Sequence, residues 1–341
     1  MRRGSCCLSG LFVVLLALAT ASFANKGDWI PTGLQEVQVA TFAIDPRTSS
    51  TLYAAWNGIY KSTNGGATWR RLKLGFTGVH VQALAIDPQT PSTVYAGTDN
   101  AGILKSTNGG ASWHRANRGL TTSWIEVLAI DPQTPSTLYA GCEGIFKSTN
   151  GGASWTPINK GLITTNAVFA IVVDPLTPST LYAGKTYHRG VFKSTNGGAS
   201  WTSAGLATIS VGALVIDPKV PSTLYAGTDT VGANPGGIFK STDSGASWTF
   251  VGLAGETMNS LVTDPQRPST IYAGSESGLF RSTNGGASWT SEDDGLIGGG
   301  VQALAIDPQS PCTLYASTPG NAKGIGGNTY KRSFADGHCG R

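Results

Sequence analysis

The chain has 341 residues, of which 46 are Gly, 2 are Met and only 13% are charged. This composition suits short strands and tight turns better than helices. The net charge of +4 includes Arg2 and Arg3 near the N-terminus and gives no indication of nucleic-acid binding.

The N-terminus has the pattern of a secretory signal. Arg2 and Arg3 precede an apolar run at 11–19, which is too short to anchor stably in a bilayer, and small residues flank Phe23. We predict a signal peptide over residues 1–24, cleavage after Ala24 and a secreted or periplasmic protein, with an uncleaved anchor as the alternative. No later segment reaches membrane length, so no transmembrane segment is expected after signal removal.

Almost all of the remaining chain consists of seven near-copies of one unit. An Asp-Pro pair marks each copy, and the pairs are separated by 42–47 residues, at Asp45, Asp87, Asp131, Asp174, Asp217, Asp264 and Asp307. A fixed period of this length is typical of a propeller or a solenoid.

The second copy shows how one unit folds. Its first segment, 81–86, is almost wholly apolar, as in a strand buried on both faces, and Asp87-Pro88 ends it. Two further strands follow at 93–97 and 102–107. The turn Asn108-Gly109-Gly110 then leads to Trp113 and an outer fourth strand. Four strands without a helix signal predict a propeller blade.

The chain termini are predicted to close the ring. Six copies end in the turn and its Trp, whereas the seventh has three strands and no Trp. The missing strand matches residues 27–31, where Trp29 stands as Trp155 does in its copy. We therefore predict an all-β, seven-bladed propeller of four-stranded blades, a single domain over 25–341, whose N-terminal strand completes the last blade.

Three cysteines remain in the predicted mature chain. An oxidising compartment favours pairing, and Cys312 and Cys339 are expected on the same face of the last blade. We predict a Cys312–Cys339 disulfide, with two free thiols as the alternative, and a sheltered Cys142.

The turns at 62–69 and 241–248 resemble the Asp-box, or BNR, repeat, whose pattern is Ser-x-Asp-x-Gly-x-x-Trp. The resemblance covers about residues 27–334. Five turns carry Asn in place of the acid, which can still accept a backbone N–H. The six residues, which the resemblance implies are structural, are Asn64, Asn108, Asn150, Asn196, Asp243 and Asn284.

Families that share this repeat have unrelated roles, and fold alone does not fix function. They include sialidases, xyloglucanase-type glycoside hydrolases, the sortilin receptor propeller and photosystem II assembly propellers. Seven blades are more similar to the xyloglucanase-type and photosystem-assembly propellers than to six-bladed sialidases. The sortilin and photosystem-assembly resemblances imply a protein or peptide ligand.

Residues that recur in every copy are explained by the blade itself. The seven Asp before Pro and seven cations of the third strand are expected to form ion pairs or to cap turns, each contributing little. The cations are Lys61, Lys105, Lys147, Lys193, Lys240, Arg281 and Lys331.

The copies differ most in the loops that join strand two to three and strand four to the next blade. These loops emerge opposite the turns, on what we call the variable face, where binding is expected. Two positions near the start of each inner strand lie two residues apart, so their side chains should point the same way. They predict a pocket at the mouth of the central channel. It would contain His80, Gln82, Trp124, Glu126, Asn259 and Gln302, with Trp56, Tyr187 and Arg189 on the rim.

The hypothesis of an enzyme is weaker than that of a binding protein. Glu126 is the one catalytic candidate if the protein is a glycoside hydrolase, because an apolar setting can keep a carboxyl protonated. Asp99, Glu143 or Glu276 could partner it, but no spacing marks an acid pair. Sialidase-like sites resemble three arginines around a carboxylate, and we expect only Arg118 and Arg189 to reach this face, with Arg71 in an outer strand.

The preferred reading is a secreted, monomeric, non-enzymatic binding module or assembly scaffold that recognises a protein or peptide on the variable face. The alternative is a polysaccharide-active glycoside hydrolase or a glycan-binding lectin. No metal, cofactor or nucleic-acid partner is expected.

Overall fold

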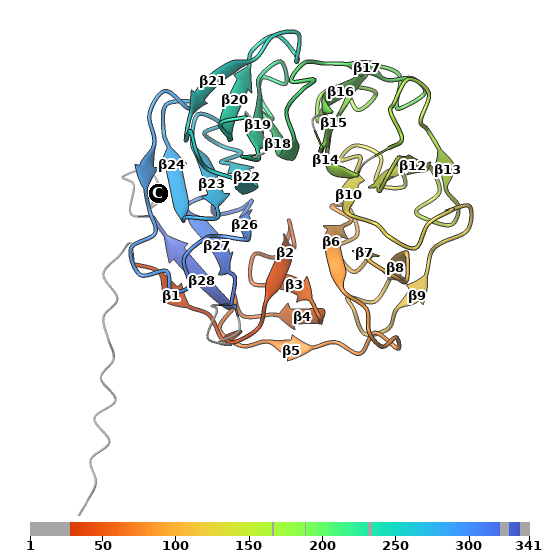
Figure 1. Cartoon of the computed structure of the whole chain (residues 1–341). Coiled ribbons are helices and arrows are strands. Elements are labelled where there is room, and N and C mark those ends of the chain that lie inside the picture. The colour runs from red at the N-terminus through yellow and green to blue at the C-terminus, as the bar shows by residue number, and fades with distance from the viewer. Residues whose placement is uncertain (1–27, 166, 188, 231–233, 321–326, 335–341) are drawn as a thin grey trace, which may run out of the picture.

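A computed structural model describes residues 28–165, 167–187, 189–230, 234–320 and 327–334. These residues contain 28 strands and no helix, and the strands form seven four-stranded antiparallel sheets. The sheets stand around a central channel as the blades of a propeller (Figure 1). The predicted all-β, seven-bladed architecture is confirmed.

Each blade runs from an inner strand at the channel to an outer strand at the rim (Figure 1). Blade 1 contains β2 (Val39–Ile44), β3 (Leu52–Trp56), β4 (Gly58–Ser62) and β5 (Arg70–Arg71). Blade 2 contains β6 (Val81–Ile86), β7 (Val94–Thr98), β8 (Ile103–Ser106) and β9 (His114–Arg115). Blade 3 contains β10 (Val127–Ile130), β11 (Leu138–Gly141), β12 (Ile145–Ser148) and β13 (Thr156–Pro157).

Blades 4 to 7 repeat this order. Blade 4 contains β14 (Val168–Val173), β15 (Leu181–Lys185), β16 (Gly190–Ser194) and β17 (Thr202–Ser203). Blade 5 contains β18 (Val211–Ile216), β19 (Leu224–Thr228), β20 (Gly237–Ser241) and β21 (Thr249–Gly252). Blade 6 contains β22 (Met258–Thr263), β23 (Ile271–Ser275), β24 (Leu279–Ser282) and β25 (Thr290–Ser291). Blade 7 contains β26 (Ala303–Ile306), β27 (Thr313–Thr318), β28 (Asn328–Ser333) and β1 (Ile30–Pro31).

The N-terminal strand completes the last blade, as predicted. Ile30 of β1 pairs with Lys331 of β28, and the two strands lie side by side in the ring (Figure 1). Trp29 is buried and its Nε1 donates to the carbonyl oxygen of Glu292 at 2.7 Å. Trp289 of blade 6 makes the equivalent bond to Val251 of blade 5 at 2.9 Å. The segment around Trp29 therefore replaces the missing end of the seventh copy.

The six turns that end in Trp share one hydrogen-bond pattern. In the first, Ser62 Oγ accepts from the Gly66 amide at 2.9 Å and donates to Asn64 Oδ1 at 3.0 Å, and Asn64 Oδ1 accepts from the Thr68 amide at 2.9 Å. Gly66 has a φ of 87°, which favours glycine. Asp243 accepts from the Ser247 amide in the same way, and hydrogen bonds from Ser247 lower the pKa of Asp243 to about 2. Asn and Asp thus hold the same turn.

The recurring acids and the recurring cations have different structural roles. Each repeated Asp caps a turn, as Asp87 does by accepting from the amides of Gln89 and Thr90. The lysines instead reach the next blade: Lys105 Nζ and Tyr95 Oη both donate to the carbonyl oxygen of Gly151, at 2.7 and 3.0 Å. We call this arrangement the inter-blade clasp.

The clasp recurs around the ring. Both donors reach one acceptor in four blades, through Tyr53 and Lys61, Tyr95 and Lys105, Tyr182 and Lys193, and Tyr225 and Lys240. Tyr315 closes the circle by donating to Gly65 of blade 1 at 3.2 Å. The hydrophobic clusters also lie between neighbouring blades: one joins Ile59 of blade 1 to Leu104 of blade 2. Blade-to-blade contact is therefore the core of this fold.

Several sequence predictions concern residues that the structure leaves undescribed. Cys312 is disulfide-bonded and Cys142 is a buried free thiol. The predicted partner, Cys339, and the predicted signal peptide, 1–24, lie outside the described residues, and both stay predictions. Within the described ranges, no helix is long and apolar enough to cross a membrane.

Candidate functional site

A pocket of about 840 Å³ opens on the variable face between blades 2, 3 and 4. We call it the acidic pocket, since three of its lining side chains are carboxylates: Asp99, Glu126 and Glu143. Its walls come from the β7–β8, β11–β12 and β15–β16 turns and from the connections that enter β10 and β14. A volume of this size is typical of ligand sites.

Glu126 is held in this pocket by its own backbone. The amide of Ile125 donates to Thr98 of blade 2 at 2.8 Å, and the amide of Glu126 donates to Gly141 of blade 3 at 2.9 Å. The half-buried carboxyl therefore lies where two blades meet. Burial raises the pKa of Glu126, the negative charge of Asp99 raises it further, and a hydrogen bond with Trp124 opposes both. The predicted direction of the shift is therefore present, with burial as its main cause.

Two aromatic side chains stand beside the carboxylates with little cover. Trp124 is 53% exposed and Tyr187 is 67% exposed, although large aromatic surfaces are usually buried. Tyr187 has a φ of 54°, an uncommon conformation for a residue with a Cβ. The tight turn between β15 and β16 thus holds the ring out at the pocket wall. Both aromatics can stack on a ligand.

Trp56, His80 and Asp99 form one connected group on the same face. His80 Nδ1 lies 2.7 Å from Asp99 Oδ2, and the His80 amide donates to Asp99 Oδ1 at 3.1 Å. The Asp99 amide donates in return to the His80 carbonyl oxygen at 3.1 Å. Trp56 of blade 1 stacks on the His80 ring with centroids 5.1 Å apart. These contacts fix the β3–β4 turn of blade 1 to the entry of β6 and the β7–β8 turn of blade 2.

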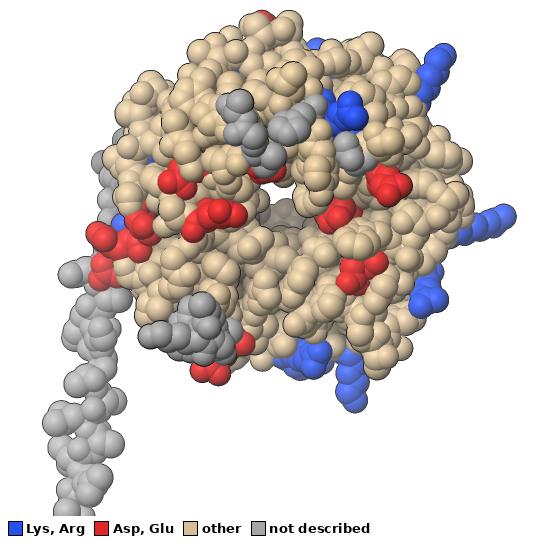
Figure 2. Space-filling model, in the orientation of Figure 1, with Lys and Arg blue, Asp and Glu red and all other residues tan. Residues whose placement is uncertain are grey.

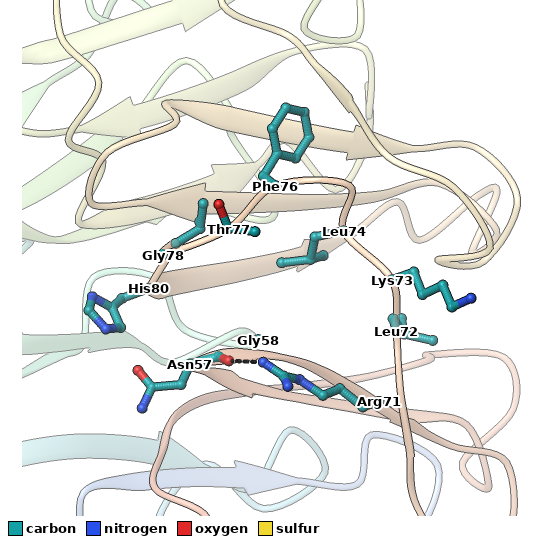
Figure 3. A pocket seen from close by; sticks show the side chains of 11 residues that line it. Asn57, Gly58, Arg71, Leu72, Lys73, Leu74, Phe76, Thr77, Gly78 and His80 are labelled. Atoms are coloured by element: carbon teal, nitrogen blue, oxygen red, sulfur yellow. Dashed lines mark hydrogen bonds between the residues drawn. The ribbon is translucent and has the colours of Figure 1, made fainter.

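A second pocket, of about 550 Å³, lies between blades 1 and 2 (Figure 3). We call it the basic pocket, because its lining contains Arg71, Lys73 and His80. Figure 3 shows His80 and Asn57 at one end and Lys73 at the other. Arg71 does belong to an outer strand, but its Nη2 donates to the Asn57 carbonyl oxygen at 2.8 Å. The expectation that Arg71 does not reach the variable face is wrong, because its side chain extends to the β3–β4 turn.

The other sequence-derived site residues line neither of these two pockets. Gln82 lies at a β-bulge between Val81 and Ala83. Asn259 donates through Nδ2 to the Val301 carbonyl oxygen at 3.1 Å, which joins blades 6 and 7. The backbone amide of Gln302 donates to the Ser317 carbonyl oxygen within blade 7. Arg189 follows the Tyr187 turn, and its buried Nε has no hydrogen-bond partner among the described residues.

Some pocket residues were missed from the sequence. Thr121, Thr122, Ser123 and Thr164 add hydroxyl groups to the acidic pocket, and Phe76 lines the basic pocket. The Thr-Thr-Ser run directly before Trp124 was the available signal. A polar run that ends in an exposed aromatic marks a loop built for contact rather than for packing.

Two buried groups, Cys142 and Lys185, lie at or near the acidic pocket. Burial raises the pKa of the Cys142 thiol, which keeps it protonated and unreactive at neutral pH. Lys185 is fully buried nearby, and its Nζ donates to the Glu143 carbonyl oxygen at 3.2 Å. Burial lowers the pKa of Lys185 to about 8. Cys142 lines the pocket, and Lys185 is linked to it through Glu143.

Solved structures similar to this protein share its propeller fold. No protein-family model matches the sequence, and no functionally described protein matches it by sequence. The GH74 enzyme of Niastella koreensis superposes with a TM-score of 0.71 and 22% identity, over 89% of this chain and 53% of that one. YCF48 bound to D1 peptide gives 0.67 and 14%, over 94% and 98%. YCF48 from Cyanidioschyzon merolae gives 0.65 and 13%, over 89% and 98%.

These similar structures differ in the share of their own length that this chain covers. The chain spans about half the length of the GH74 enzymes that it resembles and nearly the whole length of the YCF48 chains. At these identities the likeness shows the fold: a seven-bladed β-propeller.

Proposed function

We propose that this protein is a secreted, non-enzymatic binding or assembly-scaffold propeller that recognises a protein or peptide at the acidic pocket. The observation that carries this proposal is the convergence of Trp124, Tyr187 and three carboxylates from three blades on one pocket of about 840 Å³. Exposed aromatics on a rigid scaffold are typical anchors for a partner.

The charge of the pocket favours a peptide over a neutral polysaccharide. A bound ligand would remove water from Asp99, Glu126 and Glu143, and buried carboxylates need compensating donors or charges. A peptide supplies backbone N–H groups and cationic side chains, whereas a neutral glycan supplies hydroxyls alone. The structure of YCF48 with D1 peptide offers a precedent for peptide binding on this fold.

Further parts of the proposal rest on sequence. Residues 1–24 would direct export, 25–341 would form the mature monomeric domain, and Cys312 would pair with Cys339. The hydrogen bonds of the six turns also support their assignment as Asp-box repeats.

A pull-down with paired variants tests the binding proposal. The mature chain, a Trp124→Ala/Tyr187→Ala variant and a Leu176→Ala control would be immobilised and exposed to extract from the source cells. Leu176 is 62% exposed in the β14–β15 turn, on the opposite face. We expect a protease-sensitive partner that the native chain and the control retain and the double variant loses. Identical retention by all three would contradict the proposal.

One observation favours a second candidate, a glycoside hydrolase. Burial raises the pKa of Glu126, as a general acid requires, and Asp99 lies in the same pocket. Asp99, however, is held through both oxygens by His80, which disfavours a role as nucleophile or base. Hydrolysis of xyloglucan or a related β-glucan by the native chain, abolished in Glu126→Gln, would establish this alternative. We expect no turnover.

A further inference from the structure

The acidic and basic pockets adjoin each other along one pair of residues. His80 lines the basic pocket and Asp99 lines the acidic pocket. The contact of 2.7 Å between their side chains and the two backbone-linked hydrogen bonds at 3.1 Å fix this pair as the ridge between the pockets. Trp56 stacks against His80 and supports the ridge from blade 1. A ligand that spans the ridge would occupy both pockets at once.

The two pockets carry opposite charge. The basic pocket has Arg71 and Lys73 and no carboxylate among its described lining residues. Arg115 lies next to this lining, with its guanidinium 5.1 Å from the centroid of the Phe76 ring. The acidic pocket has three carboxylates and no Lys or Arg among its described lining residues. Neither Arg71 nor Lys73 forms an ion pair with another described residue, so each retains capacity for an anion.

Each pocket also has the geometry for its ion. Arg71 is anchored through Nη2 to the Asn57 carbonyl oxygen, which fixes a guanidinium plane that can bind a carboxylate (Figure 3). In the acidic pocket, the exposed faces of Trp124 and Tyr187 stand beside the carboxylates. Aromatic faces with nearby carboxylates favour a flat or bulky cation such as an Arg or Lys side chain.

The pockets follow a charge gradient on the molecular surface. Figure 2 shows Asp and Glu side chains around the mouth of the channel, whereas most Lys and Arg side chains in view project from the periphery. Such complementary fields orient a charged ligand before contact.

We propose that the ligand is an extended peptide segment with a basic residue followed or preceded, a few residues away, by an acidic one. The basic side chain enters the acidic pocket between Trp124 and Tyr187, the acidic group binds Arg71 and Lys73, and the backbone crosses the His80–Asp99 ridge. The inference rests on the proposed function and narrows it to peptides of paired opposite charge. It places the basic side chain on the blade 3 side of the ridge and the acidic group on the blade 1 side, with either chain polarity allowed.

Selection from a random displayed-peptide library tests the inference directly. Four selections would use the native mature chain, Glu126→Gln/Glu143→Gln, Arg71→Gln/Lys73→Gln and the matched control Leu176→Ala. We expect the native chain and the control to enrich Arg or Lys together with Asp or Glu at a preferred spacing. The acidic-pocket variant should lose the basic preference alone, and the basic-pocket variant the acidic preference alone.

A synthetic peptide of the selected sequence gives the quantitative measurement. Its dissociation constant should rise about tenfold for each double variant, which corresponds to about 1.4 kcal/mol. Binding should also weaken as salt increases, because both contacts are between charges. Circular dichroism would establish that the variants, whose side chains all line one of the two pockets, remain folded.

The outcomes separate this inference from the proposed function. Enriched peptides without paired charges, or with a charge pattern that neither double variant alters, would overturn the inference and leave peptide binding intact. Failure of the native chain to enrich any peptide over a Trp124→Ala/Tyr187→Ala variant would overturn both.

Discussion

Glu126 shows how a single ionisable residue is governed by its backbone anchors. Two amides, of Ile125 and Glu126 itself, bond to neighbouring blades and leave the carboxyl half-buried at the blade junction. Burial then raises its pKa. The raised pKa means that the folded protein binds the proton more tightly than the unfolded chain does. The raised pKa therefore costs stability at neutral pH, and the cost shrinks as pH falls below the folded pKa and is gone below the unfolded pKa.

Replacing this carboxyl with an amide should stabilise the protein in a pH-dependent way. We expect Glu126→Gln to raise the melting temperature at pH 7, because the amide has no charge to desolvate. The gain should shrink as pH falls toward the unfolded value of Glu, about 4.3. Thermal unfolding followed by circular dichroism between about pH 4, near the unfolded pKa of Glu, and about pH 8 would measure this gain in melting temperature.

Glu143→Gln is the matched control, since Glu143 lines the same pocket but is exposed. It should leave the melting temperature nearly unchanged over the same range. A Glu126→Gln variant that behaves like this control would mean that the carboxyl pays no desolvation cost in the fold.

Residue orientation was the hardest feature to predict from sequence. His80 and Gln82 share parity, which predicts that their side chains point the same way in an unbroken strand. The bulge between Val81 and Ala83 interrupts that alternation at Gln82. Bulges recur at the same place in β2, β14, β18 and β22. The bulged positions carry residues as different as Ala40 and Phe169, so the residue type does not predict a bulge.

At the scale of elements, the inter-blade clasp makes stronger contacts than the sequence predicted for these residues. The recurring cations were expected to form weak exposed ion pairs or turn caps, yet Lys105 bonds to a backbone carbonyl of the next blade. Lys105 is half-buried in this position, and desolvation by burial lowers its pKa. Tyr95 bonds to the same oxygen and lies under the ammonium, 5.3 Å from ring centroid to Nζ.

Removing either donor of the clasp should weaken the junction between blades 2 and 3. We expect Lys105→Met and Tyr95→Phe each to cost about 1 kcal/mol of unfolding free energy, the usual contribution of one hydrogen bond. The double variant should show non-additivity, because both donors share the Gly151 oxygen. Urea unfolding would give the three values.

Lys73→Met provides the comparison, because Lys73 is exposed and makes no such bridge to another blade. Its effect should stay within about 0.5 kcal/mol. If Lys105→Met were equally mild, the clasp would contribute nothing beyond a surface contact.

The elements themselves could be predicted because each blade repeats the same local signals. Apolar runs such as 81–86 became inner strands, and Asp-Pro pairs ended them as expected. The pockets could not be predicted in the same way. They depend on how far loops of unequal length, such as those carrying Trp124 and Tyr187, rise from neighbouring blades. That height is set by contacts between blades, which the period of one blade does not encode.

At the scale of the whole molecule, the ring is held at one seam by segments about three hundred residues apart. Blade 7 takes three strands from the C-terminal part of the chain and one from β1. The side-chain hydrogen bond of Thr329 Oγ1 to the Leu34 carbonyl oxygen, at 2.8 Å, adds to the strand pairing. Closure of this kind removes the free strand edges that would otherwise pair with another chain. The stability of the propeller should therefore depend on a few residues near its N-terminus.

Trp29 is the residue on which closure should depend most. Its indole is 5% exposed, packs with Tyr330 and Leu304 in the seam cluster and donates to Glu292 at 2.7 Å. Trp29→Ala should lower the unfolding free energy by about 3–5 kcal/mol, as for other buried aromatic-to-alanine changes. It should also expose the β28 edge, which concentration-dependent light scattering would detect as association. Ile30→Ala, one residue away but 51% exposed, should cost less than about 0.5 kcal/mol and leave the protein monodisperse. Equal effects of the two substitutions would show that the ring is closed by strand pairing alone and that the buried indole is not what holds the seam.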